Sequence, residues 1–280
     1  MRSLRLGSVI FAAALAIAAL ALSACGAAKK AAGVVDPVAQ ASVATQRAGT
    51  AEMTFHGQFA AGAQRVPIDG HGVISTRDDA RARLSFAFEN KGHPVKLNEI
   101  LANDEIYLGG DVLAKDLPSG KSWAKLDLRR LARQAGIDVG QLDGGGSSAR
   151  RMLDYLRGAG SIHKVGRDHV VGAETTHYHA VVDVDKLARE RGAADFESSL
   201  HRLKAQLTGP MTVDVWVDGR HRVRQEKVDY AASQSGQTVR ATFTIQLVRF
   251  GVPLKLDVPA KDDVEDLTGR LVKQLSKRNG

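Results

Sequence analysis

The chain has 280 residues, a formal net charge of +8 and a single cysteine. Its ordinary glycine and proline contents exclude a collagen-like or low-complexity chain, and its length fits one large folded domain. No dense basic run with interleaved aromatic side chains occurs, so the charge does not indicate nucleic-acid binding. It fits a mixed solvated surface, or attraction to anionic lipid headgroups and acidic envelope polymers.

Residues 1–24 have the form of a bacterial signal peptide. Arg2 and Arg5 supply a positive start, residues 9–22 form an uncharged apolar core, and small residues precede Cys25. The core is shorter than the roughly 20 residues that span a bilayer, so a retained transmembrane anchor is the weaker interpretation. The tetrapeptide that ends in Cys25 resembles a lipobox, which predicts that Cys25 is lipidated and becomes the first mature residue. An ordinary signal peptide with an incidental cysteine is the alternative.

The mature chain is expected to contain a tether and one domain. Residues 25–35 are small and polar, which predicts a flexible lipidated tether, and residues 36–280 are expected to form a single domain. Asp36 and Pro37 are typical of a helix N-cap and first helical position, so they predict a short helix that ends near Arg47.

Strands are predicted after this helix. Met53 and Phe59 lie at even separation from Phe55, as on one face of a strand. The apolar residues of a second strand, Leu84, Phe86 and Phe88, alternate with small or polar residues. Residues 98–109 predict two strands joined by a tight turn at Asn103-Asp104.

The middle of the chain is expected to be more helical. Residues 128–134 and 148–157 predict short helices on either side of the glycine-rich loop 143–147. No Gly-Lys-Ser/Thr follows the glycines, so a flexible loop is a better interpretation than a phosphate-binding loop. After a strand at 174–184, a helix is expected from Asp185. Its apolar stripe must cover an apolar surface, and consists of Phe196, Leu200, Leu203 and Leu207.

Consecutive hairpins are predicted in the last third. Val213, Val215 and Val217 alternate with other residues in one strand, and Asp218-Gly219 predicts a tight turn into a returning strand at 223–232. A further strand at 238–250 places Phe243, Ile245 and Leu247 on one face. The tail is expected to end in a helix with leucines at a spacing of four, Leu267, Leu271 and Leu275.

These elements predict an α+β fold. A large curved antiparallel sheet has its apolar concave face covered by helices. Four segments of this fold carry a family resemblance. They are residues 105–108 with 120–127, residues 171–178 with their Thr-Thr-His-Tyr sequence, residues 215–218, and residues 250–259.

In this order, the segments resemble those of the LppX/LprA/LprF/LprG-type lipoproteins of actinobacteria, over roughly Asp36 to Leu275. The resemblance implies an open, half-closed β-barrel like that of the periplasmic lipoprotein carrier LolA, in which helices line a cavity for acyl chains. It also implies that lipids or lipoglycans are bound and assisted toward the cell surface.

Two histidines form the feature most like a metal site. His177 and His179 are expected on the same strand face, and Asp183, His163 or His169 could supply a third ligand. Sheet-face residues with ordinary hydrogen bonds are the favoured interpretation. No Gly-x-Ser-x-Gly nucleophile turn occurs. The sequence therefore predicts a binding protein without metal or cofactor rather than an enzyme.

The predicted ligand-binding residues are apolar side chains of the strands and the helix stripe. They are Leu84, Phe86, Phe88, Phe196, Leu200, Leu203, Val215, Phe243, Ile245 and Leu247. Each acyl methylene moved from water to such a surface gains about 0.8 kcal/mol, so affinity does not require a headgroup contact.

The expected partners are acyl chains of lipids or lipoglycans, the outer face of the cell membrane through Cys25, and an envelope transporter or other protein. Nucleic acid is not expected. A solid core would favour the alternative, an extracytoplasmic lipoprotein with a structural, adaptor or sensor role that binds a protein partner and carries no lipid.

Overall fold

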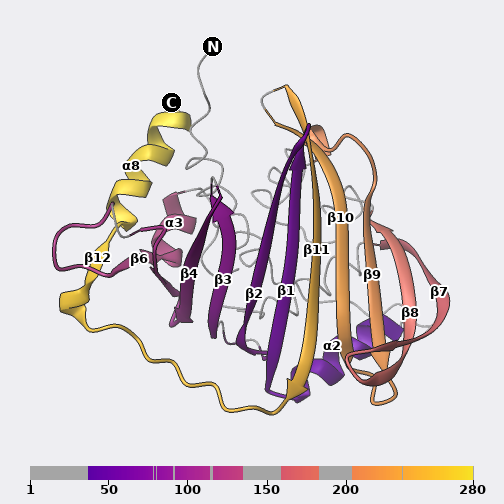
Figure 1. Cartoon of the computed structure of the whole chain (residues 1–280). Helices are drawn as coiled ribbons and strands as arrows, with labels where there is room; N and C mark the ends of the chain where they lie inside the picture. Colours follow the sequence, from indigo (N-terminus) through magenta and orange to yellow (C-terminus); the bar gives the residue numbers. More distant parts are fainter. Residues whose placement is uncertain are drawn as a thin grey trace.

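The structure is a computed structural model that describes residues 37–279, except 78, 80, 91, 114–115, 135–158, 183–203 and 235 (Figure 1). Several predicted features lie outside the described residues. They are the signal peptide, Cys25 and the tether, the glycine-rich loop with the helix at 148–157, Asp183, and the stripe residues Phe196, Leu200 and Leu203.

A single sheet of 12 strands contains two meanders. The N-terminal meander consists of β1 (Thr50–Ala61), β2 (Gln64–Ser75), β3 (Ala82–Asn90), β4 (His93–Ala102), β5 (Glu105–Gly109) and β6 (Trp123–Asp127). The C-terminal meander consists of β7 (Ala159–Val170), β8 (Ala173–Val182), β9 (Met211–Asp218), β10 (Val223–Gln234) and β11 (Gln237–Phe250). Within each meander, neighbours along the chain pair antiparallel.

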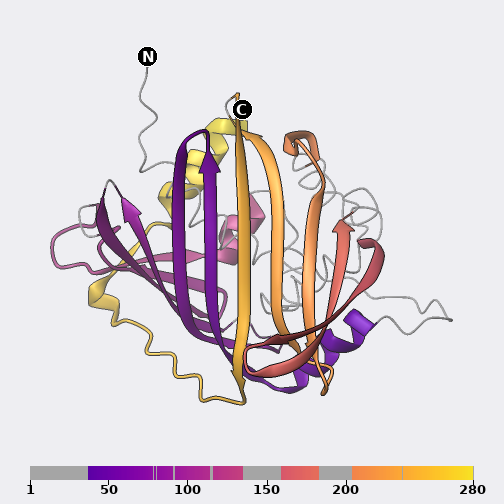
Figure 2. The same cartoon turned by 45° about the vertical axis from the view of Figure 1, so that its right-hand side comes forward.

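The two meanders join through β1 and β11 at the middle of the sheet. These strands pair antiparallel, with Phe55 opposite Ile245. The sheet does not close, because β7 forms one edge and the short strand β12 (Val264–Asp266) forms the other. Figure 2 shows β4 to β6 bending behind β1 and β2. The predicted α+β fold with an open, curved antiparallel sheet is confirmed.

One face of the sheet carries the apolar core, and we call it the inner face. Along β1, the buried Met53 and Phe55 alternate with Thr54 and His56 on the opposite, outer face. A larger cluster extends over β1 to β6 and β11, and a second over β8 to β10. The alternation is what a sheet with one dry and one wet face requires.

Among the described residues, three helices pack at the two ends of this core. α2 (Pro37–Arg47), whose bounds match the prediction, packs Val38 and Ala41 into the second cluster. α3 (Leu128–Gln134) and α8 (Thr268–Asn279) contact each other beside β6. Leu131, Leu267 and Leu271 pack against the larger cluster. In the part of the chain that the structure describes, no helix has the length and apolar character needed to cross a membrane.

Two predicted turns differ in outcome. Asn103 and Asp104 both have positive φ, 52° and 62°, as the predicted tight turn between β4 and β5 requires. The β9–β10 connection is longer than the predicted Asp-Gly turn. The Asp218 carboxylate accepts backbone N–H bonds from Arg220 and Arg222 at 2.9 Å, and His221, not glycine, takes the positive φ of 57°. The Asp218 side chain stabilises this wider loop in place of a two-residue turn.

An extended strap, residues 251–263, leads from the end of β11 to the far edge of the N-terminal meander (Figure 1). Asp257 pairs with Arg83 of β3 at 2.5 Å on the way. The strap ends in a short 3-10 turn, Lys261–Asp263, and then in β12, which pairs parallel with β6. Lys125 of β6 binds Glu105 at 2.9 Å and Asp266 of β12 at 3.3 Å.

Candidate functional site

The inner face brings together the described members of the predicted binding set. Phe86, Phe88, Phe243 and Leu247 are buried in the larger cluster, and Leu84 and Ile245 pack against it half-buried. Val215 is fully buried in the second cluster. Their common face agrees with the strand periodicity, whereas their contact with a lipid stays a prediction.

Aromatic rings fill the space above glycines on this face. A Cβ added to Gly70 would lie 2.5 Å from the ring of Phe86, and one added to Gly57 would lie 2.8 Å from the ring of Phe55. The Phe55 ring packs against Phe86 and Phe243, each with a centroid separation of 5.8 Å. The glycines therefore let the rings approach the backbone closely, and the rings form a continuous apolar wall across β3, β2, β1 and β11.

Leu84 and Ile245 are among the apolar residues of the inner strands that keep part of their surface accessible. Leu84 of β3 lies between Gly72 and Glu99 on the neighbouring strands, and Ile245 lies between Phe55 and Glu226. Both are half-buried, although flanking residues such as Phe86 and Leu247 are buried. Both residues therefore retain some accessible apolar surface on the inner face.

Two glutamates stand among these apolar side chains. Glu99 and Glu226 lie on the inner face, 7% and 3% exposed. Burial raises the pKa of Glu99 to about 7 and the pKa of Glu226 to about 8. No described residue forms a hydrogen bond with Oε1 of Glu226. At pH 7, the Glu226 carboxyl group is therefore mostly protonated and the Glu99 carboxyl group is about half protonated.

Sequence reasoning missed these acids, although the signal was present. Glu226 has the same strand parity as Val228 and Tyr230, and Glu99 the same parity as Leu97 and Leu101. An acid at an inward position of an alternating pattern marks a buried carboxyl group.

The outer face holds the two histidines of the predicted Thr-Thr-His-Tyr strand. His177 Nε2 and His179 Nδ1 lie 2.7 and 2.9 Å from the same oxygen of Asp214, on β9. The His177 ring stacks on Trp216 with a centroid separation of 4.3 Å. The prediction that both histidines share a face is confirmed, and Asp214 and Trp216 are partners that the sequence did not indicate.

The side chains of His177, His179, Asp214 and Trp216 connect β8 and β9, and Trp216 extends these contacts to β7. Trp216 Nε1 donates to Asp168 of β7 at 3.0 Å, and that hydrogen bond lowers the pKa of Asp168. No group of three or more His, Cys, Asp or Glu side chains among the described residues could hold a metal ion. The geometry agrees with the hydrogen-bonded interpretation of His177 and His179.

Comparisons of the sequence give a distant relative. No family model matches the chain. An uncharacterized 31.2 kDa protein of Streptomyces griseus, from the rplA-rplJ intergenic region, is 29% identical over 184 residues. The alignment covers 63% of this chain and 57% of the relative, so the chain spans less than two thirds of that protein's length.

Among solved structures, the chain is similar to LppX of Mycobacterium tuberculosis, with a TM-score of 0.38, 13% identity, and coverage of 80% of this chain and 100% of LppX. LprF of Mycobacterium bovis gives a TM-score of 0.39, 11% identity, and coverage of 80% and 95%. A LolA superfamily protein of Nitrosomonas europaea gives a TM-score of 0.31 and 7% identity, and the match covers 80% of this chain and 96% of that protein. At these identities and TM-scores, we take neither ligand nor partner from these proteins.

Proposed function

We propose that this chain is an extracytoplasmic lipoprotein, anchored to the outer face of the cell membrane through lipidated Cys25, that binds acyl chains on the inner face of its sheet. It carries or presents lipids or lipoglycans for envelope assembly, and it is a binding protein rather than an enzyme. The half-buried Leu84 and Ile245 at the middle of an apolar wall are the observation that carries the proposal.

The physical basis is the burial of apolar surface. An acyl chain that covers Leu84 and Ile245 exchanges its own hydration, and theirs, for apolar contact. At about 0.8 kcal/mol for each methylene, a chain of moderate length gains several kcal/mol before the cost of ordering is subtracted. The lipobox-like sequence at Cys25 supports delivery of this surface to the membrane.

Tryptophan substitution tests the proposal. Val215 and Leu247 are poor positions for this test, because both are buried and added volume would strain the packing. Leu84→Trp and Ile245→Trp place the added ring where apolar surface is accessible. We expect each variant to lower the amount of copurified lipid and to keep a melting temperature close to that of the wild type. Ala87→Trp, on the exposed outer face of β3, is the matched control and should change neither quantity.

Lipid analysis by mass spectrometry and thermal melting of the full-length chain give the two readouts. Unchanged lipid occupancy together with a sharply lowered melting temperature in both inner-face variants would contradict the proposal. That result would indicate a solid core and favour an envelope protein with a protein partner.

A further inference from the structure

A buried carboxyl oxygen beside the apolar wall has no hydrogen-bond partner among the described residues. Glu226 is in β10, opposite Val215 of β9 and Ile245 of β11. Its side chain is buried, and within the part of the chain that the structure describes Oε1 has no hydrogen-bond partner. Buried polar atoms are almost always hydrogen-bonded in folded proteins, so an unpaired one beside accessible apolar surface calls for an explanation.

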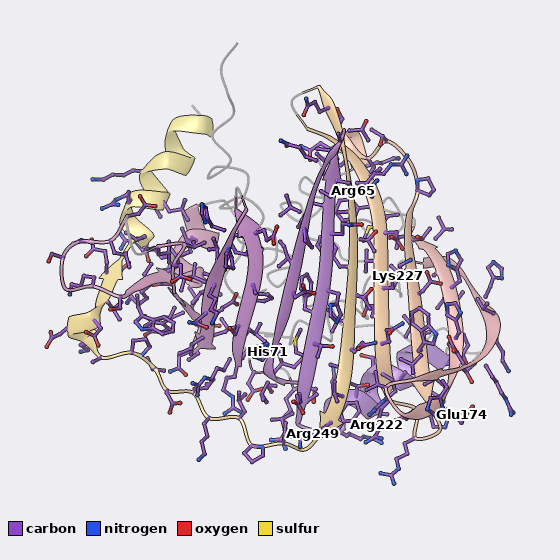
Figure 3. All side chains as sticks on the ribbon, viewed as in Figure 1. Arg65, His71, Glu174, Arg222, Lys227 and Arg249 are labelled. Carbon is purple, nitrogen blue, oxygen red and sulfur yellow. The ribbon has the colours of Figure 1, made fainter. Side chains whose placement is uncertain are left out.

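No described neighbour offers Glu226 a compensating charge. Lys227, the next residue, lies on the outer face and pairs with Asp229 at 2.9 Å (Figure 3). Arg224 donates through Nη2 to the carbonyl oxygens of Val171 and Val248.

The groups packed around Glu226 are mostly apolar. Val215 faces it from β9, Ile245 from β11, and Phe55 lies beyond Ile245 on β1. Two tyrosines of the inner face belong to the same surroundings: Tyr230 lies four residues along β10, and Tyr178 of β8 lies across Val215. Burial raises the pKa of Tyr230. Burial is also what raises the pKa of Glu226 to about 8, so at neutral pH the group is a neutral carboxylic acid with one O–H donor.

We propose that Glu226, as a neutral acid, donates a hydrogen bond to the carbonyl oxygen of an acyl ester bound along the inner face. The inference rests on the proposed function and narrows its ligand class. The ester carbonyl is an uncharged acceptor within an otherwise apolar molecule, and therefore suits both the apolar wall and the unpaired acid. Ile245, the direct neighbour of Glu226, keeps the apolar surface along which the chain of such an ester would lie.

The test compares two probes that differ in the acceptor alone. Native mass spectrometry of the full-length chain in detergent measures the occupancy by methyl palmitate and by a straight-chain alkane of the same length. We expect the wild type to bind the ester about fivefold more tightly than the alkane, the effect of one ordinary hydrogen bond. Glu226→Leu should remove this preference and bind the alkane at least as well as the wild type does.

A second variant tests whether the preference for the ester depends on the titratable proton of Glu226. Glu226→Gln keeps an N–H donor that does not titrate, so its preference for the ester should be the same below and above pH 8. The wild type should lose its preference as the pH rises through about 8, because the ionised carboxylate cannot donate. Glu174→Leu, at an exposed glutamate paired with His169, is the control and should behave as the wild type does (Figure 3).

The outcomes separate the inference from the function on which it rests. If the wild type binds both probes equally, or if Glu226→Leu keeps the ester preference, the role of Glu226 is overturned while acyl binding stands. If the wild type binds neither probe, the proposed function fails together with the inference. Tighter binding of a long-chain amine than of the ester would also overturn it, in favour of a charged carboxylate that recognises a cation.

Discussion

Gly70 shows how a missing side chain shapes the inner face. A methyl group at this position would lie 2.5 and 2.7 Å from two ring carbons of Phe86. Because that ring is buried and packed against Phe55, Gly70→Ala should displace it and lower the free energy of unfolding by about 1–3 kcal/mol.

Urea unfolding of the variant measures this loss. Gly166→Ala, in β7, is the control, since a methyl group there meets no atom within 4 Å. We expect the control to be neutral or slightly stabilising. Equal unfolding midpoints for Gly70→Ala and the wild type would show that the Phe86 ring does not need this close approach.

Glu99 gives a prediction about pH. Its pKa is about 7 in the folded chain and about 4.5 when unfolded, so between these values the unfolded chain loses a proton that the folded chain retains. The stability of the wild type should therefore fall, relative to Glu99→Gln, as the pH rises from about 4.5 to about 7, and the difference should then level off. Its size is on the order of 1.4 kcal/mol for each pH unit of the shift.

Melting temperatures of the wild type and Glu99→Gln across this pH range check the prediction. The raised pKa of Glu226 affects the stability of both proteins in the same way, so the difference between their curves reports Glu99. If the difference in melting temperature between the two proteins is the same at pH 5 and at pH 8, Glu99 is ionised in the folded chain at both pH values and the prediction is wrong.

For single residues, the sequence predicted the sheet face of a side chain better than it predicted the burial or the partners of that side chain. The alternation in β3 and β11 placed Phe86 and Phe243 correctly on one face. It could not reveal that Glu226 is buried, because charged side chains are normally solvated and their burial depends on what covers the sheet. The partners of His177 likewise come from β9, and pairing between strands is not encoded in local periodicity.

At the scale of elements, one threonine fastens a helix to the sheet. Thr45 of α2 donates through Oγ1 to the Ala41 carbonyl at 2.7 Å and accepts the backbone N–H of Val223, in β10, at 2.9 Å. Thr45→Val keeps the shape of the side chain but leaves the buried N–H without a partner. We expect this variant to lose about 1–3 kcal/mol of stability.

Thr244→Val, on the outer face of β11, is the matched control and should change stability by less than about 0.5 kcal/mol. Chemical denaturation measures both variants. If they behave alike, the hydrogen bonds of Thr45 do not contribute to holding α2 on the sheet.

The predictability of the elements follows from how local their signals are. Capping residues defined the bounds of α2, and α3 begins at Leu128 as predicted. β12 was missed because it has only three residues and depends on a partner more than a hundred positions away, β6. The β9–β10 loop was misjudged because the carboxylate of Asp218 organises a wider connection than the Asp-Gly pair alone indicates.

At the scale of the whole molecule, the proposed anchor is testable through Cys25. Without the thiol no acyl group can be attached, and two or more acyl chains are needed for stable membrane anchoring. Cys25→Ala should therefore accumulate as unprocessed precursor or be released from membranes by a carbonate wash. Immunoblotting of washed membranes measures both. Cleavage at the usual position with full membrane retention would contradict the prediction.

The pairing of β1 with β11 has a consequence for folding kinetics. Most neighbouring strands within each meander are joined by short connections, but the pair at the centre of the sheet joins residues near position 50 to residues near position 250. Such long-range pairing is slow, because a large loop must close before the contacts form. A chain that crosses the membrane from its N-terminus therefore leaves β1 with one unpaired edge until β11 arrives. During this interval the nascent protein is most exposed to edge-to-edge aggregation.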